Sequence, residues 1–126
     1  QITENNLGKE TDNPYIAPVI MEFFATHYSA NFVESQNADL IIRGVVNTRS
    51  VSDKPNDYGL FQTFADATIS ISNGKTGEKL LEKSFNKIQG SDFSSNRESA
   101  NQALKKLSER ITEEFLPDLI DLIHGL

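Results

Sequence analysis

Hydrophobic residues recur at steps of three and four in the last quarter of the chain, and this spacing predicts one long amphipathic helix. Ser95 and Glu98 have the spacing of a capping box, so the helix is expected to begin directly after Ser95. Pro117 is expected to kink or interrupt the helix in its last third. The apolar positions are Ala100, Leu104, Leu107, Ile111, Phe115, Leu119, Leu122 and Leu126. Burial of the large side chains in this stripe would contribute roughly 10–20 kcal/mol before conformational entropy is subtracted, so the helix is expected to supply much of the core.

Three segments in the middle of the chain have strand patterns. Residues 38–51 contain two short apolar runs, which suit a strand buried on both faces or central in a sheet. Residues 60–72 alternate between apolar and polar side chains, as a strand with one buried face does. Residues 79–88 form the return strand of a hairpin that turns at Asn73-Gly74. The return strand is rich in lysine, which indicates an edge strand.

The beginning of the chain has little periodicity, and residues 1–12 are expected to be a flexible lead-in. Asn13 and Pro14 then have the character of a helix start, and a short helix is expected to end near Tyr28. With 126 residues the chain fits one domain, assigned to residues 13–126. The predicted fold is α+β: an antiparallel meander of three to four strands, with the short N-terminal helix and the long C-terminal helix packed on one face.

Composition excludes several classes of function. The formal charge of −6 argues against general binding of nucleic acid and against adhesion to anionic lipid headgroups. No stretch approaches the roughly 20 apolar residues of a membrane-spanning helix. The chain contains no cysteine, which excludes disulfides, cysteine-ligated metals and thiol catalysis. It begins at Gln1 with a polar segment that is not a signal peptide, so a processed or trimmed chain is expected, from which an export signal could have been removed.

Catalytic and cofactor motifs are not evident. Gly74-Lys75-Thr76 resembles part of a phosphate-binding loop, but Ile69 stands where that motif needs glycine, so a hairpin turn is predicted. His27 and His124 lack companions at metal-ligand spacing. We therefore predict no catalytic residue, no cofactor and no metal, and expect a binding domain rather than an enzyme.

Two sets of loop residues keep other interpretations open. Tyr58, Phe61 and Phe64 flank the turn between the first two predicted strands, where they would either bind a partner or pack in the core. Loop carboxylates would make a hydrolase if two of them converged in one cleft. These carboxylates are Asp53, Asp57 and Asp92.

Residues 38–116 resemble a known group of bacterial envelope lipoproteins. The segment ADLIIRGVV (38–46) is similar to the strand that opens this domain, followed by its glycine. FADATISI (64–71) with KTGEKLL (75–81) resembles its long strand, TGE turn and return strand. SANQAL (99–104) is similar to the alanine-rich start of its last helix. The group includes the TolB amino-terminal domain, the curli-secretion lipoproteins, the penicillin-binding-protein activators and flagellar lipoproteins.

This resemblance implies an exported domain that scaffolds or activates another envelope protein in the periplasm or at the outer membrane. It implies no catalytic residues. The cysteine of a lipid anchor is absent, so an anchor would belong to sequence upstream of Gln1. Two alternatives stay open: a lipopolysaccharide-assembly-like lipoprotein, and a protein that binds a small molecule or lipid in a pocket between the helices and the sheet. The oligomeric state is not predicted.

Overall fold

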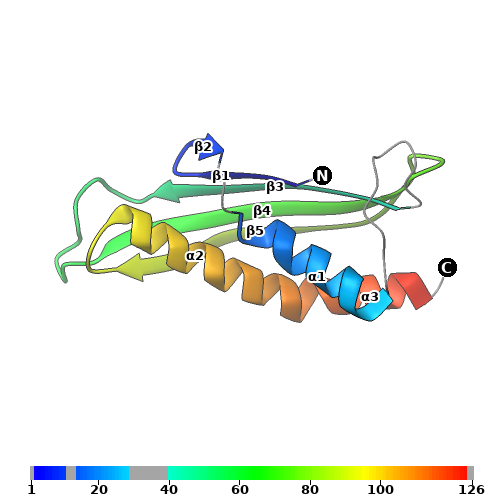
Figure 1. Ribbon diagram of the computed structural model, residues 1–126. Coiled ribbons are helices and arrows are strands. Elements are labelled where there is room, and N and C mark those ends of the chain that lie inside the picture. The colour runs from blue at the N-terminus through cyan, green and yellow to red at the C-terminus, as the bar shows by residue number, and fades with distance from the viewer. Residues whose placement is uncertain (1, 11–13, 29–39, 125–126) are drawn as a thin grey trace.

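The computed structural model describes residues 2–10, 14–28 and 40–124, which form a long sheet covered on one face by helices (Figure 1). Strand order across the sheet is β2-β1-β3-β4-β5. The strands are β1 (Ile2–Asn6), β2 (Lys9–Glu10), β3 (Leu40–Ser50), β4 (Phe61–Asn73) and β5 (Lys79–Asp92). The helical segments are α1 (Ile16–Tyr28), α2 (Asn96–Arg110), the π-helical η2 (Ile111–Phe115) and α3 (Leu116–His124).

The α+β class and the long C-terminal helix are confirmed, but the sheet is mixed rather than a purely antiparallel meander. Strands β3, β4 and β5 form the expected antiparallel meander. Strand β1 runs parallel to β3, with Ile2 opposite Gly44, and the short β2 pairs antiparallel with β1. These two strands come from the segment expected to be a lead-in. They lie at the sheet margin, where a strand needs no continuous buried face. Their mostly polar sequence therefore lacks the apolar–polar alternation that would reveal a strand.

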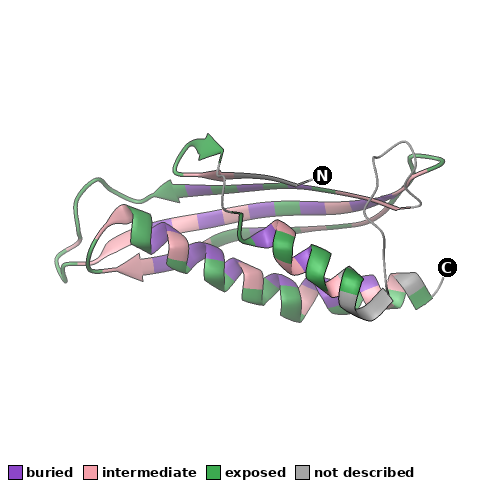
Figure 2. Cartoon of the chain, viewed as in Figure 1, coloured by how far each residue is buried: buried purple, intermediate pink, exposed green. Residues whose placement is uncertain are grey.

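Side chains alternate between two faces of the sheet, and the helices cover one of them (Figure 2). On the covered face, Val46 of β3 lies opposite Ala67 of β4, and both are buried. On the other face, Val45 is 51% exposed, so β3 is central in the sheet but is not buried on both faces as its apolar runs suggested. Strand β5 is an edge strand, as its lysines predicted.

Helix α2 begins where the capping box predicted. The side chain of Ser95 accepts a hydrogen bond of 3.1 Å from the backbone N–H of Glu98. The apolar stripe faces the sheet, and its largest fully buried members include Leu104, Leu107 and Phe115. Helix α1 packs into the same core through Ile16 and Ile20, so both helices do lie on one face.

The last helix is interrupted just before Pro117, as predicted. In η2 the backbone N–H of Leu116 bonds to the carbonyl of Ile111, five residues back, instead of four. Proline has no N–H to continue the α-helical ladder, and the wider turn accommodates it. Lys83 Nζ of β5 donates a hydrogen bond of 3.1 Å to the Glu114 carbonyl, which fixes this irregular turn to the sheet.

Gly90 sets how closely α2 approaches the sheet. A Cβ atom at this position would lie 2.2 Å from both the Ala103 nitrogen and the Ser99 carbonyl oxygen, closer than any real contact. The helix presents small side chains here, because Ser99, Ala100 and Ala103 are all buried. The hydroxyl groups of Ser99 and Thr63 lie 2.6 Å apart in a buried hydrogen bond across this contact. Strand β5 and helix α2 are therefore packed tightly against each other just before the connection that joins them. We call this contact the β5–α2 joint.

Candidate functional site

Large apolar side chains are exposed at one end of the sheet, where the β3–β4 connection (51–60) and the β5–α2 connection (93–95) lie together (Figure 1). Tyr58 is 84% exposed and Phe93 is 73% exposed, and Val51 is 51% exposed. We call the surface formed by Tyr58, Phe93 and Val51 the aromatic end, after its two exposed rings. Such exposure of aromatic side chains is unfavourable in water unless another surface covers it, and it commonly marks an interaction site.

The two connections contact each other. A Cβ atom placed on Gly59 would lie 3.9 Å from Cδ1 of Phe93, so the Phe93 ring packs beside the residue that follows Tyr58. Gly59 has φ +80°, a conformation that other residues adopt rarely. Asn96 Nδ2 at the start of α2 donates a hydrogen bond of 3.0 Å to the Ser52 carbonyl. Tyr58 and Phe93 therefore belong to one surface, although they are far apart in sequence.

A hydrogen-bond network centred on Asn56 fixes the long β3–β4 connection. Its side-chain oxygen accepts from the backbone N–H groups of Tyr58, at 2.9 Å, and Leu60, at 3.0 Å. Its backbone N–H donates to the Leu60 carbonyl at 2.8 Å, and its carbonyl accepts from the Gly59 N–H at 2.9 Å. Because these bonds already hold the loop, a partner would bind Tyr58 without first having to order its backbone.

Asp92 fixes the second connection in the same manner. Its carboxylate accepts hydrogen bonds from the backbone N–H of Ser94, at 2.8 Å, and from the Ser94 hydroxyl. These bonds stabilise the ionised form, with the side-chain bond contributing most, and lower the pKa of Asp92 below its ordinary value. Phe93 therefore projects from a short turn whose carboxylate is ionised at neutral pH.

The structure separates the three aromatic residues predicted to bind a partner. Tyr58 is at the aromatic end. Phe61 is half-buried at the start of β4, where it pairs with Asp92. Phe64 lies on the uncovered face of the sheet, with the Arg49 guanidinium carbon 5.1 Å from its ring centroid. Sequence reasoning missed Phe93, although an aromatic residue between the last strand residue and a helix cap has no core position to fill.

The other candidates have ordinary structural surroundings. Asn73 confirms the predicted turn at Gly74, because its side-chain oxygen accepts from the backbone N–H groups of Lys75 and Thr76. His124 is exposed at the end of α3, and the side chain of His27 lies outside the described residues. Within the ranges that the structure describes, no three His, Asp or Glu side chains gather as a metal-binding group would.

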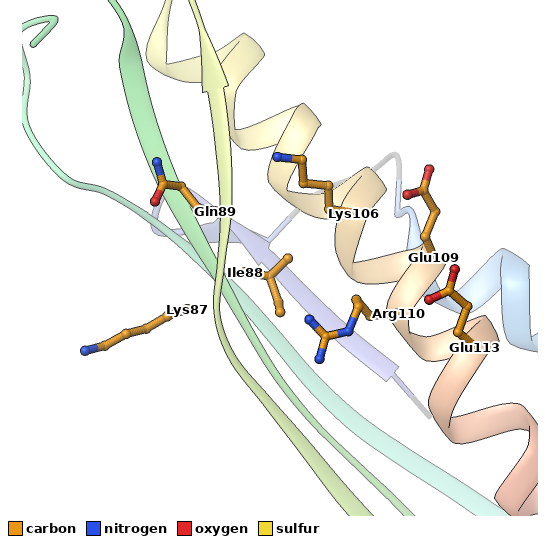
Figure 3. Close-up of a pocket in the computed structure, with 7 residues that line it drawn as sticks. All are labelled: Lys87, Ile88, Gln89, Lys106, Glu109, Arg110 and Glu113. Atoms are coloured by element: carbon orange, nitrogen blue, oxygen red, sulfur yellow. The ribbon is translucent and has the colours of Figure 1, made fainter.

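A groove of about 290 Å³ runs between β5 and α2 (Figure 3). Its lining is mostly charged, with Ile88 as the one apolar member. Arg110 Nε bonds to Glu114 Oε2 at 2.6 Å, and this bond lowers the pKa of Glu114. The charged side chains that α2 and η2 contribute, Lys106, Arg110, Glu109 and Glu113, are of both signs, so they select no ligand charge, and Lys87 of β5 points away from the helix (Figure 3). This groove is unlike the apolar pocket between helices and sheet that a lipid-binding protein would need.

Comparisons with known proteins leave the family open. No family model matches the chain, and no curated protein matches it. Among solved structures, the chain is similar to a neuraminyllactose-binding hemagglutinin homolog from Helicobacter pylori, with a TM-score of 0.49 and 14% sequence identity. The match covers 90% of this chain and 84% of that one. Likeness at this level carries no functional argument. In the part of the chain that is described, no helix is long and apolar enough to cross a membrane.

Proposed function

We propose that this chain is a non-enzymatic interaction domain of the bacterial cell envelope, and that it binds another envelope protein through the aromatic end. The observation that carries the proposal is the exposure of Tyr58 and Phe93, 84% and 73%, on two connections that hydrogen bonds hold in place. Neither ring contributes to the core, so their exposure needs a reason other than folding.

The physical basis is the cost of leaving such surface in water. Tyrosine and phenylalanine supply large contact area with few rotatable bonds, and aromatic anchors of this kind dominate the binding energy of many interfaces. Each ring would release roughly 1.5–3 kcal/mol on full burial, before the costs of association are subtracted. A second surface at this end of the sheet would therefore gain most of its affinity from two side chains.

The envelope location and the scaffolding or activating role rest on the resemblance of residues 38–116 to envelope lipoproteins. In this proposal the chain works in the periplasm or at the outer membrane. The partner is a protein, because the formal charge of −6 disfavours nucleic acid and anionic lipid.

Site-specific photocrosslinking in living cells tests the proposal. A photoreactive amino acid replaces Tyr58, Phe93 or, as a control, Thr112, which is exposed on the helical layer. We expect the same protein adduct from positions 58 and 93 in the envelope fraction, and none from position 112. The adduct at position 58 should fall at least several-fold when Phe93 is also changed to serine, because both rings contact one partner.

Two results would contradict the proposal. Equal adducts from all three positions would mean non-specific collision rather than a binding surface. A chain recovered only from the cytosol, when the full-length gene is expressed from its own promoter, would remove the envelope assignment.

A further inference from the structure

Each exposed ring of the aromatic end follows an aspartate in the sequence. Asp57 precedes Tyr58, and Asp92 precedes Phe93. Asp57 is exposed, whereas Asp92 is half-buried and bonded to Ser94. Since Phe93 packs beside Gly59, the structure brings both acid–aromatic pairs to the same end of the sheet.

In the part of the chain that the structure describes, no ion pair neutralises these carboxylates. Ion pairs among the described residues join Arg49 to Asp66, Lys79 to Glu82, Lys83 to Asp118 and Arg110 to Glu114. Neither Asp57 nor Asp92 takes part in one of these pairs. The cations in the same region, Lys54 and Arg97, take part in none either. The Asp57 carboxylate is therefore available to a charge supplied by another molecule, and Asp92, already bonded to Ser94 through Oδ2, keeps its other oxygen for one.

Aromatic rings and carboxylates favour the same kind of ligand. The face of an aromatic ring has negative potential and attracts a cation, and arginine is the side chain most often found there. The guanidinium group is planar, so it can stack on a ring while its N–H groups bond to a carboxylate. An ammonium group on a lysine offers the charge without the planar stacking surface.

We propose that the aromatic end recognises an arginine side chain of its partner, stacked on Tyr58 or Phe93 and hydrogen-bonded to the neighbouring aspartate, with adjacent apolar residues of the partner covering the rest of the surface. This inference rests on the proposed function, since it names the chemistry of the partner at that same site. An anionic membrane surface is disfavoured as the occupant, because Asp53, Asp57 and Asp92 would face negative headgroups.

Peptide display tests the inference without knowledge of the partner. A library of random peptides is selected on the whole chain, and peptides that also bind the Tyr58→Ser/Phe93→Ser variant are discarded. We expect arginine next to an apolar residue to be enriched in the remaining peptides. In a synthetic copy of a selected peptide, replacing arginine by citrulline keeps the shape and removes the charge, and should weaken binding about ten-fold or more.

A matched pair of charge variants locates the interaction. Asp57→Asn removes the carboxylate beside Tyr58 and should weaken the arginine peptide roughly five-fold or more. Asp53→Asn removes an equal charge from the same connection, away from the rings in sequence, and should change binding less than about two-fold. Tyr58→Phe keeps the ring face and should bind nearly as well as the original chain, whereas Tyr58→Leu should not.

Three results would overturn the inference. The first is that the selected peptides depend on the two rings but carry no cation. The second is that Asp57→Asn and Asp53→Asn weaken binding of the arginine peptide equally. The third is that the library yields no peptide whose binding depends on the rings. The first of these leaves the proposed function standing, because binding at the aromatic end would remain. The proposed function fails separately, if crosslinking in cells does not depend on positions 58 and 93.

Discussion

Two neighbouring parts of the β5–α2 joint are packed in opposite ways. At Gly90 the helix backbone touches the strand so closely that even one additional carbon atom would overlap Ala103 and Ser99. Three residues further on, Phe93 is 73% exposed. The chain thus passes from a very close helix–strand contact to a mostly exposed aromatic ring within three residues.

This difference indicates that the exposure of Phe93 does not come from loose packing. Hydrogen bonds hold the connections around the ring: Asp92 accepts from Ser94, and Asn96 Nδ2 donates to the Ser52 carbonyl, although Asn96 Oδ1 is buried without a partner among the described residues. The rigid joint instead determines where the ring projects. Binding residues on connections held by a rigid scaffold are the usual arrangement of interaction sites.

The largest expected effect comes from filling the space at Gly90. Gly90→Val should lower the free energy of unfolding by about 3 kcal/mol or more, because the new side chain must displace the backbone of α2. Chemical denaturation followed by circular dichroism measures this. Gln89→Ala, one residue earlier and exposed, is the control and should cost about 0.5 kcal/mol or less. Equal stability of both variants would mean that α2 does not pack closely against β5 at Gly90.

A smaller effect is expected from the buried hydroxyl pair beside this glycine. Ser99→Ala removes the partner at 2.6 Å from Thr63, which keeps only a weak contact of 3.4 Å with the Asn96 carbonyl. The expected loss of stability is about 1–2 kcal/mol. In a double-mutant cycle with Thr63→Val, the two losses should be clearly less than additive. Full additivity would show that the two hydroxyls do not interact.

Removal of the Asn56 side chain tests whether hydrogen bonds hold the β3–β4 connection at the aromatic end. Asn56→Ala deletes the acceptor of two backbone N–H groups and should cost about 1 kcal/mol. Hydrogen exchange should become faster at the amides of Tyr58 and Leu60, and stay unchanged in β5. Asn86→Ala, on an exposed strand position, should leave the exchange of this connection unaltered. Fast hydrogen exchange at the Tyr58 and Leu60 amides of the original chain would mean that the connection is not preorganised.

The Asp92 turn gives a pH dependence of known sign. Its pKa is lowered in the folded chain, so the carboxylate contributes stability above its ordinary value of 3.8, and that contribution is lost as the pH falls through the folded-state pKa. Asp92→Asn removes this carboxylate and its pH-dependent contribution to stability. The difference in unfolding free energy between the two proteins should therefore be largest near neutral pH and shrink below about pH 4. A difference that grows in acid would contradict this role of Asp92.

Much of the fold could be predicted because its signals are local or periodic. The Ser95–Glu98 capping box, the Asn73 turn and the lysines of β5 each correspond to the expected feature. Strands β1 and β2 were missed because their mostly polar sequence does not alternate, although the tight turn at Leu7-Gly8 that joins them is a local hairpin signal. The place of β1 depends on pairing with β3, some forty residues away in sequence, and β2 pairs with β1.

The candidate site was predicted less completely, for a different reason. Tyr58, Phe61 and Phe64 were all predicted because they flank a long turn, but Phe61 and Phe64 lie on opposite faces of β4. Phe93 is brought beside Gly59 by the pairing of β4 with β5, which no local pattern reveals. A surface made by two connections is visible only when the sheet register is known.

The most direct measurement follows stability and partner binding together in the Tyr58→Ser/Phe93→Ser variant. Because both rings are mostly exposed, the change in unfolding free energy should stay within about 0.5 kcal/mol for each substitution. Recovery of the partner crosslinked from a photoreactive residue at Val51, which belongs to the same surface, should fall at least ten-fold. An equally stable variant that still captures the partner in full amount would contradict the account.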